Sequence, residues 1–331
     1  MATRYDMGSP QGQPVAPCCY LPVPRRETTA GQPASPGHML DINKILIPVD
    51  FSSRSRRAIE HGINIAKHFN AGVVFLHVIP DLPYDSAFLT EYGAAGAFWT
   101  PTPDHLAAIR KKLHALVEQV APGHPGDRVV VNGPPAVLIE DTIKQLDVDL
   151  VVMPTAGAGP FRRFLLGSVT TKVLNDSECP VFTGAHVDDI ETFSLRPYRR
   201  IGCAIDLEEQ SSRVLRFAND FAAAYRAELE VVHAIPAISE DGGGTRAAPQ
   251  LGRVLEDHIR TRTAAMLDEI NADAQVLVDI GEPENVVARA AEEQNLDLLV
   301  IGRRRDDGLF AGLRSHAFGM IRRAPCPVLS V

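Results

Sequence analysis

The chain has 331 residues, 45% of them hydrophobic, which is enough for two domains that each bury a normal core. A formal net charge of −8 argues against general nucleic-acid binding, and no apolar run approaches the roughly 18 residues of a membrane span. The N-terminus lacks the basic and apolar segments of a secretory signal, and an odd count of five cysteines suits reduced thiols, so we expect a cytoplasmic protein.

Composition divides the chain into four parts. Residues 1–39 are rich in Pro, Gly, Gln, Ser and Thr without apolar periodicity, and we expect a disordered tail. Strand and helix patterns fill residues 40–186 and 198–331, which we predict to be two domains joined by a linker at 187–197. The tail contains the adjacent Cys18 and Cys19, which by themselves indicate no specific chemistry.

The first domain is predicted to alternate strands with helices. Apolar runs without polar alternation are typical of strands covered on both faces, and apolar residues at helical spacing follow them. The expected strands are 44–49, 72–79, 128–132, 150–153 and a last strand that begins at Cys179. The expected helices are one capped by Ser52 or Ser53 that ends near residue 69, then 104–120, 136–146, and one that begins with Ser168 as N-cap. A long loop at 80–103 is a candidate lid or contact surface.

The second domain repeats this order. Its expected strands are 200–205, 229–235, 275–280 and 298–301, with helices that begin near Ser211, span 251–270, and end near residue 294. The two copies keep a steady spacing: 156 residues for Asp50 to Asp206 and His77 to His233, 148 for Gly133 to Gly281, and 147 for Cys179 to Cys326. Because the spacing changes only inside loops, the pattern predicts a duplicated unit.

Strand–helix alternation predicts an α/β fold with two tandem Rossmann-like domains. Each domain is expected to be a five-stranded parallel sheet in the order 3-2-1-4-5, flanked by helices. Ligands of such sheets bind past the carboxyl ends of the strands, where the strand order reverses. This places Asp50 and the loop at 154–168 at one cleft, where loop amides are suited to bind phosphate.

Each of the two units resembles the universal stress protein (UspA) domain. The resemblance extends from about residue 43 to residue 331 and depends on the segments KILIPVDFS, VVFLHVI, LLGSVT and ECPV. ATP-binding members of the family carry Gly, two residues, Gly, nine residues, then Gly and Ser or Thr. The first copy has Pro154, Gly157, Gly167 and Ser168 at these places, so that only Pro154 departs from the pattern.

The resemblance implies a stress-response protein that binds ATP, with or without Mg²⁺, in its first domain. Pro48, Asp50 and the backbone near Val78 would face the adenine and ribose, and the loop and helix start would face the phosphates. The residues implied at the site are Pro48, Asp50, Val78, Met153, Pro154, Gly157, Gly159, Gly167, Ser168 and Val169. Pro154 removes one amide donor, which predicts weaker binding rather than none.

The second copy departs further from the nucleotide pattern. Arg305 stands where the second glycine belongs, and Arg314 precedes Ser315 in place of glycine. Together with Arg303 and Arg304, these side chains are expected either to bind an anion or to pair with the neighbouring aspartates at 306 and 307. We therefore expect nucleotide in the first domain only.

Several alternatives stay open. Asp50 also suits a structural cap on the following helix, and His77 and His233 suit packing or hydrogen bonding better than catalysis. We predict no catalytic residue and no metal ligand, although a slow ATPase and a scaffold without nucleotide are the competing functions. The expected partners are nucleotide and an unidentified protein, but neither nucleic acid nor membrane. The resemblance also implies that the last strands of the two halves pair within one chain as a pseudo-dimer.

Overall fold

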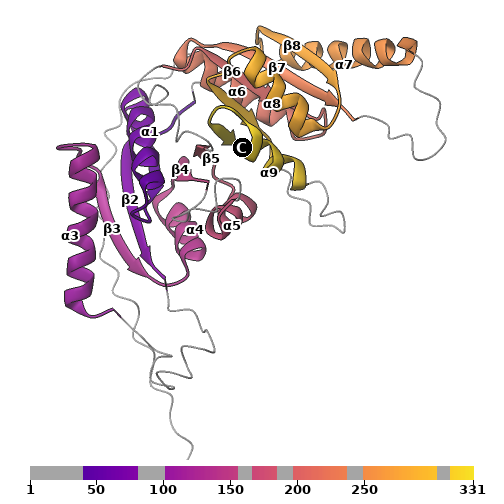
Figure 1. Ribbon diagram of the computed structural model, residues 1–331. Helices are drawn as coiled ribbons and strands as arrows, with labels where there is room; N and C mark the ends of the chain where they lie inside the picture. Colours follow the sequence, from indigo (N-terminus) through magenta and orange to yellow (C-terminus); the bar gives the residue numbers. More distant parts are fainter. Residues whose placement is uncertain (1–39, 81–100, 156–165, 185–196, 237–248, 304–313) are drawn as a thin grey trace, which may run out of the picture. The chain divides into compact units, whose positions relative to one another are not determined.

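The computed structural model describes residues 40–80, 101–155, 166–184, 197–236, 249–303 and 314–331. Within these residues the strands form one ten-stranded sheet in the order β3-β2-β1-β4-β5-β10-β9-β6-β7-β8 (Figure 1). Each half of this order reads 3-2-1-4-5 from its own outer edge, which confirms the predicted fold.

The first domain contributes strands and helices close to the predicted bounds. Its strands are β1 (Lys44–Pro48), β2 (Gly72–Ile79), β3 (Asp127–Asn132), β4 (Leu150–Pro154) and β5 (Val181–Gly184). Its helices are α1 (Ser53–Phe69), α3 (Pro103–Val120), α4 (Pro135–Leu146) and α5 (Ser168–Asp176). All five strands pair in parallel, as crossovers through helices require.

The second domain repeats the same order. Its strands are β6 (Arg200–Ala204), β7 (Glu228–Ile235), β8 (Ala274–Ile280), β9 (Leu298–Ile301) and β10 (Val328–Ser330). Its helices are α6 (Ser211–Tyr225), α7 (Pro249–Glu269), α8 (Pro283–Glu293) and α9 (Arg314–Arg323). Even its turns match, because Gly133 and Gly281 have φ of 146° and 153°, a region that side chains disfavour.

The two faces of the sheet are covered by different helices. One core cluster joins the sheet to α1, α3, α6 and α7, and the other joins it to α4, α5, α8 and α9. β9 is buried throughout and β4 is buried as far as Met153, which accounts for their unbroken apolar sequences. None of the described helices is both long and apolar enough to cross a membrane.

The last strands of the two domains pair with each other. β10 is antiparallel to β5, with Leu329 opposite Phe182, and this confirms the predicted pairing within the chain. Arg303 adds a polar connection, since its guanidinium donates to the carbonyl oxygens of Leu174 at 3.1 Å and Cys179 at 2.6 Å. This pairing covers the β5 edge of the first domain and the β10 edge of the second domain.

A smaller difference from prediction concerns Ser168 and Cys179. The N-cap of α5 is Gly167, and Ser168 is the first helical residue with an exposed side chain. Cys179 lies two residues before β5, where its buried thiol donates to the carbonyl oxygen of Val148 at 3.2 Å. The strand begins only after Pro180, whose ring nitrogen has no hydrogen to give to a ladder.

Candidate functional site

The position predicted for the cleft is where β1 and β4 end side by side. Ile45 pairs with Leu150 and Leu46 with Val151, while β2 extends the sheet on the other side of β1 and β5 extends it beyond β4. The chain therefore reverses its strand order between β1 and β4, which is the usual ligand position in such sheets. Pro48 is the last residue of β1, and Pro154 is the last residue of β4.

Asp50 organises the turn that leads from β1 into α1. Its Oδ1 accepts hydrogen bonds from the Ser52 amide at 3.0 Å, from Ser52 Oγ at 2.6 Å and from Ser55 Oγ. Ser52 in turn caps the helix by accepting from the Ser55 amide. The alternative that Asp50 itself caps the helix is wrong, because Ser52 is the N-cap; Asp50 instead holds the turn through one carboxylate oxygen, and its side chain as a whole is exposed.

The second domain shows that this use of the aspartate belongs to the fold. Asp206 Oδ1 accepts from the Glu208 amide at 3.0 Å and from Ser211 Oγ at 2.8 Å. The next residues, Phe51 and Leu207, share a left-handed backbone with φ of 61° and 62°. Both domains therefore use this aspartate to hold the turn that follows their first strand.

The backbone of Val78 lies in β2 just past the point where β1 ends. The Leu76 carbonyl accepts from the Val49 amide at 2.8 Å, so the backbone of Leu76 faces β1. Because backbone direction alternates along a strand, Val78 faces the same side, one step past the end of β1. Its side chain is buried, as is that of Met153, and both belong to the core cluster of the α4 and α5 face.

Two hydrogen bonds hold the start of α5 against the end of β4. The Gly167 amide donates to the Thr155 carbonyl at 2.8 Å, and Thr170 Oγ1 donates to the Pro154 carbonyl at 2.9 Å. Pro154, Gly167 and Ser168 are thereby brought together. Thr170 is a positioning residue that sequence reasoning missed, although a threonine in the first turn of the helix was a signal for it.

The first turn of α5 offers amide donors. The amides of Ser168, Val169 and Thr170 have no acceptor within the helix, as in any first helical turn. They lie beside Pro154 and carry the partial positive charge of the helix start. Two further predicted residues, Gly157 and Gly159, lie outside the residues that the structure describes.

The second domain uses its corresponding position differently. Arg303, which follows β9 and Gly302, extends to the carbonyl oxygens of Leu174 and Cys179 in the first domain. Sequence reasoning assigned it to an anion or to neighbouring aspartates and missed this connection. The residues predicted with it at 304 and 305, and the side chain of Arg314, lie outside the description.

An aromatic and cationic group adjoins Asp50. His77 Nδ1 lies 2.6 Å from the Val49 carbonyl oxygen, and its ring lies 4.4 Å from that of Phe51. The Lys112 ammonium lies 4.2 Å from the centre of the Phe51 ring, which is a cation–π contact. Burial lowers the pKa of His77, although the Val49 carbonyl opposes this shift. His233 makes the equivalent contact with Ile205 at 3.0 Å, which confirms a hydrogen-bonding role for both histidines.

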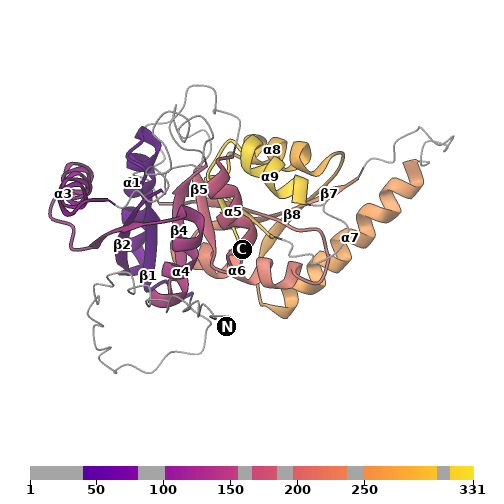
Figure 2. The same cartoon turned by 90° about the horizontal axis from the view of Figure 1, so that it is seen from below.

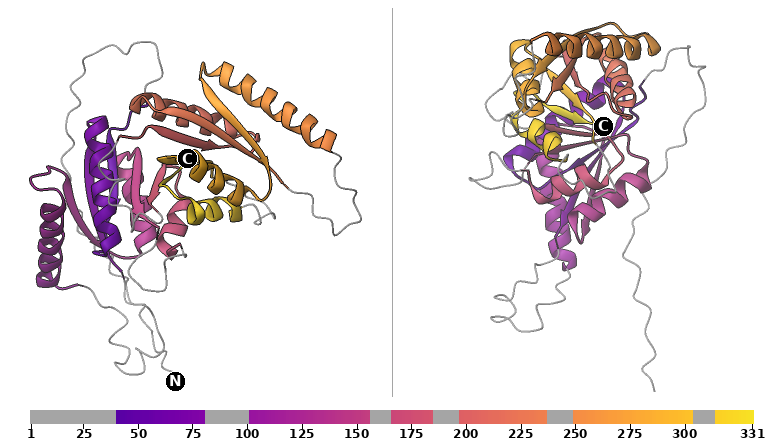
Figure 3. Two further views of the ribbon diagram at one scale, coloured as in Figure 1. Left: turned by 45° about the horizontal axis from the view of Figure 1, so that its top comes forward. Right: turned by 90° about the vertical axis from the view of Figure 1, so that its right-hand side faces the viewer.

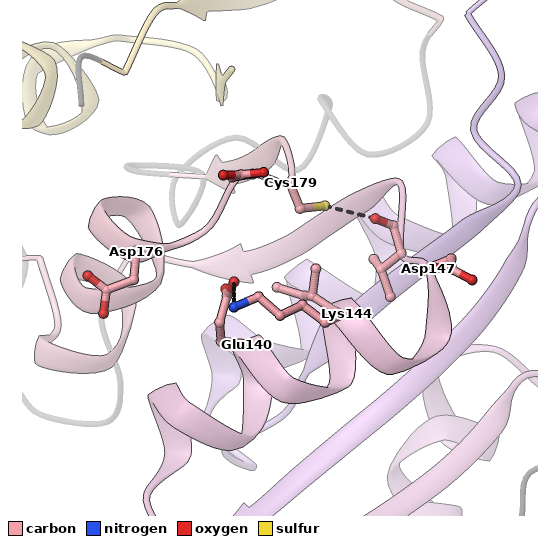
Figure 4. Close-up of a pocket in the computed structure, with 8 residues that line it drawn as sticks. Glu140, Lys144, Asp147, Asp176 and Cys179 are labelled. Carbon is pink, nitrogen blue, oxygen red and sulfur yellow. Dashed lines mark hydrogen bonds and ion pairs between the residues drawn. The ribbon is translucent and has the colours of Figure 1, made fainter.

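A cavity of about 390 Å³ lies away from this cleft (Figure 4). It is lined by the C-terminal parts of α4 and α5, at the amino ends of the strands. Its lining includes four carboxylates and one lysine, which does not suit a polyphosphate; the charged residues are Glu140, Lys144, Asp147, Asp176 and Glu178. Burial raises the pKa of the adjoining Cys179 thiol to about 12, so this thiol is not a nucleophile at neutral pH. We therefore place the candidate site at the β1–β4 cleft.

Comparisons with known proteins give one consistent result. A family described as the universal stress protein family matches residues 41–183 and 197–331. A universal stress protein of Methanocaldococcus jannaschii is 33% identical over 138 residues, which are 42% of this chain and 79% of that protein. Universal stress protein A homolog 1 of Coxiella burnetii is 30% identical over 138 residues, 40% of this chain and 96% of that protein. The crystal structure of a universal stress protein from Archaeoglobus fulgidus has the same fold, with a TM-score of 0.59 at 24% identity over 88% of this chain and 96% of that one.

Proposed function

Because the chain belongs to the universal stress protein family, as its sequence predicted, we propose that it is a nucleotide-binding stress-response module whose first domain holds ATP. The nucleotide lies at the carboxyl ends of β1 and β4, and its occupancy changes contacts with a protein partner in the cytoplasm. The second domain does not hold nucleotide in this proposal.

The observation that carries the proposal is the start of α5. Two hydrogen bonds, from Gly167 to Thr155 and from Thr170 to Pro154, hold this helix start against the end of β4. The amides of Ser168 and Val169 are then available for phosphate oxygens, and each hydrogen bond to a charged group is worth about 1.5–3 kcal/mol. Gly157 and Gly159 add loop amides in this proposal, whereas Pro154 adds none.

The other end of the cleft suits a nucleoside. The exposed Asp50 carboxylate accepts from amino or hydroxyl groups, and it keeps Oδ2 for this purpose while Oδ1 holds the turn. The backbone of Val78 faces the same space next to Pro48. These groups bind and orient, and we propose binding without hydrolysis, because Asp50 is placed beside the nucleoside and the proposal assigns no carboxylate beside the phosphates. An accompanying Mg²⁺ would be held through the phosphates.

Titration calorimetry of the full chain with ATP, ADP and AMP tests the proposal. Ser168→Asp puts a carboxylate at the first position of α5, where the helix tolerates it but a phosphate does not. We expect ATP to bind the parent chain and to bind Ser168→Asp at least tenfold more weakly. Ser315→Asp, the equivalent change in the second domain, is the matched control and leaves ATP affinity unchanged.

The absence of heat at millimolar ATP would instead favour a scaffold without nucleotide. Asp50 takes part in a turn that both domains share, and this observation favours the scaffold function. The scaffold also predicts that Ser168→Asp leaves the cellular phenotype intact.

A further inference from the structure

Three side chains with metal-binding atoms converge in the second domain. Glu282 precedes α8, Glu284 lies in its first turn, and His316 lies in the first turn of α9. One ligand atom from each lies within 4.8 Å of the other two, and His316 Nδ1 is 2.8 Å from Glu284 Oε2. Figures 2 and 3 show α8 and α9 side by side, so the cluster spans two packed helices that are about 30 residues apart in the sequence.

Helix packing holds Glu284 in place. Gly319 lies on α9, and a Cβ there would come within 3.2–3.4 Å of three carbon atoms of the Glu284 side chain. The side chain of Glu284 therefore runs along the α9 backbone at a point where only glycine leaves room for it. His316 is one helical turn earlier on α9, which aims the Glu284 carboxylate at its ring.

Glu282 is not used for the helix that it precedes. It occupies the N-cap position of α8, but its side chain makes no capping hydrogen bond. The nearby Arg323 donates to Asn285 Oδ1 at 2.6 Å. The exposed Glu282 carboxylate thus keeps its lone pairs for a ligand that approaches from solvent.

The first domain shows that the fold does not require these residues. With the spacings of 148 and 147, Glu282 corresponds to Pro134, Glu284 to Ala136, His316 to Val169 and Gly319 to Lys172. Copy one therefore has no ligand atom at any of the three places and no glycine beneath them. The second copy, whose phosphate-loop pattern is lost, carries the glutamates, the histidine and the glycine together.

We propose that Glu282, Glu284 and His316 form a binding site for a divalent transition metal ion, with Zn²⁺ as the best-suited ion. Carboxylate oxygen and imidazole nitrogen are common zinc ligands, and three protein ligands leave at least one coordination position for water. The two carboxylates balance the charge of the ion. The partial positive charge of the two helix starts weakens binding by about tenfold relative to a site without it.

The test is a titration of the full chain, without nucleotide, with Co²⁺ followed by its visible absorption and then by competition with Zn²⁺. We expect one equivalent of Co²⁺ with oxygen and nitrogen ligands, displaced by Zn²⁺. Glu282→Gln and His316→Val, which restores the residue of the first copy, should each weaken binding at least tenfold. Glu282 is exposed, so its variant is expected to keep the fold, and thermal unfolding of each variant checks this.

A matched control comes from another histidine–glutamate pair. His114 Nδ1 lies 4.0 Å from Glu118 Oε1 on α3, and no third metal-binding side chain joins them among the residues that the structure describes. His114→Val should therefore leave the titration unchanged. Three results would overturn the proposal: no binding up to millimolar Co²⁺ and Zn²⁺, a sulfur-to-cobalt absorption band that shows cysteine ligands, or equal affinity in the parent chain and in both site variants.

Discussion

The buried His61 makes a sharp prediction about stability and pH. Its side chain is 5% exposed on α1, its ring lies 5.6 Å from that of Phe182 in β5, and its Nε2 is buried without a hydrogen-bond partner among the described residues. Burial, and to a smaller extent the charge of Arg57, lowers the pKa of His61 from 6.5 to about 4. The folded protein therefore resists a proton that the unfolded chain accepts.

The magnitude follows from these two values. Above pH 6.5 the imidazole is neutral in both states and has no effect on the pH dependence. As the pH falls from 6.5 to 4, the free energy of unfolding decreases by about 1.4 kcal/mol per pH unit, or about 3 kcal/mol in all, and it levels below pH 4. Between pH 7 and pH 5 the loss from this group is about 2 kcal/mol.

Urea unfolding followed by circular dichroism at pH 7 and pH 5 measures this loss. His61→Leu removes the titrating group at similar volume, so the variant should lose about 2 kcal/mol less than the parent chain over this interval. His114→Leu, on the exposed face of α3, should keep the parent's pH dependence. Equal pH dependence in the parent chain and His61→Leu would refute the reasoning.

Three further predictions concern packing, the domain connection and the thiols. A Cβ on Gly62 would clash with Ile47 Cδ1, so Gly62→Ala should destabilise the protein by about 1–3 kcal/mol. Adding Ile47→Cys recreates the Cys203 and Ala218 pair of the second domain and should restore stability in a melting experiment. Arg303→Met removes two hydrogen bonds to carbonyl oxygens and should lower the free energy of unfolding in urea by about 2–5 kcal/mol. Lys172→Met changes an exposed side chain and should lower it by less than about 1 kcal/mol, so equal losses would contradict the connecting role of Arg303. Burial raises the pKa of the Cys179, Cys203 and Cys326 thiols to about 12. Iodoacetamide at pH 8 should therefore modify them only after unfolding, as measured by peptide mass mapping, and modification in the native protein would contradict their burial.

Most of the fold was predictable because the same sequence pattern occurs in both domains. Strands such as β2 and β9 have the predicted bounds, since an apolar run ended by a turn leaves little choice. Helix starts moved by a residue at Pro103 and Pro135, which were expected to precede their helices. Proline fits the first helical position, because no acceptor is needed there for the missing N–H.

The candidate site was only partly predictable. The residues at the ends of β1 and β4 follow from strand order, but the split use of Asp50 depends on two serines whose hydroxyls a sequence does not orient. The contact of Arg303 with the first domain depends on how the last strands pair. The convergence of Glu284 with His316 depends on the packing of α8 on α9, which no local pattern records.

The central claim is that one half of a duplicated chain holds nucleotide and the other does not. Native mass spectrometry of the full chain with excess ATP counts the bound molecules directly. The account predicts a single bound nucleotide, which Ser168→Asp depletes and Ser315→Asp leaves in place. Two bound nucleotides, or one that survives Ser168→Asp and disappears in Ser315→Asp, would contradict it, as would a chain that binds none.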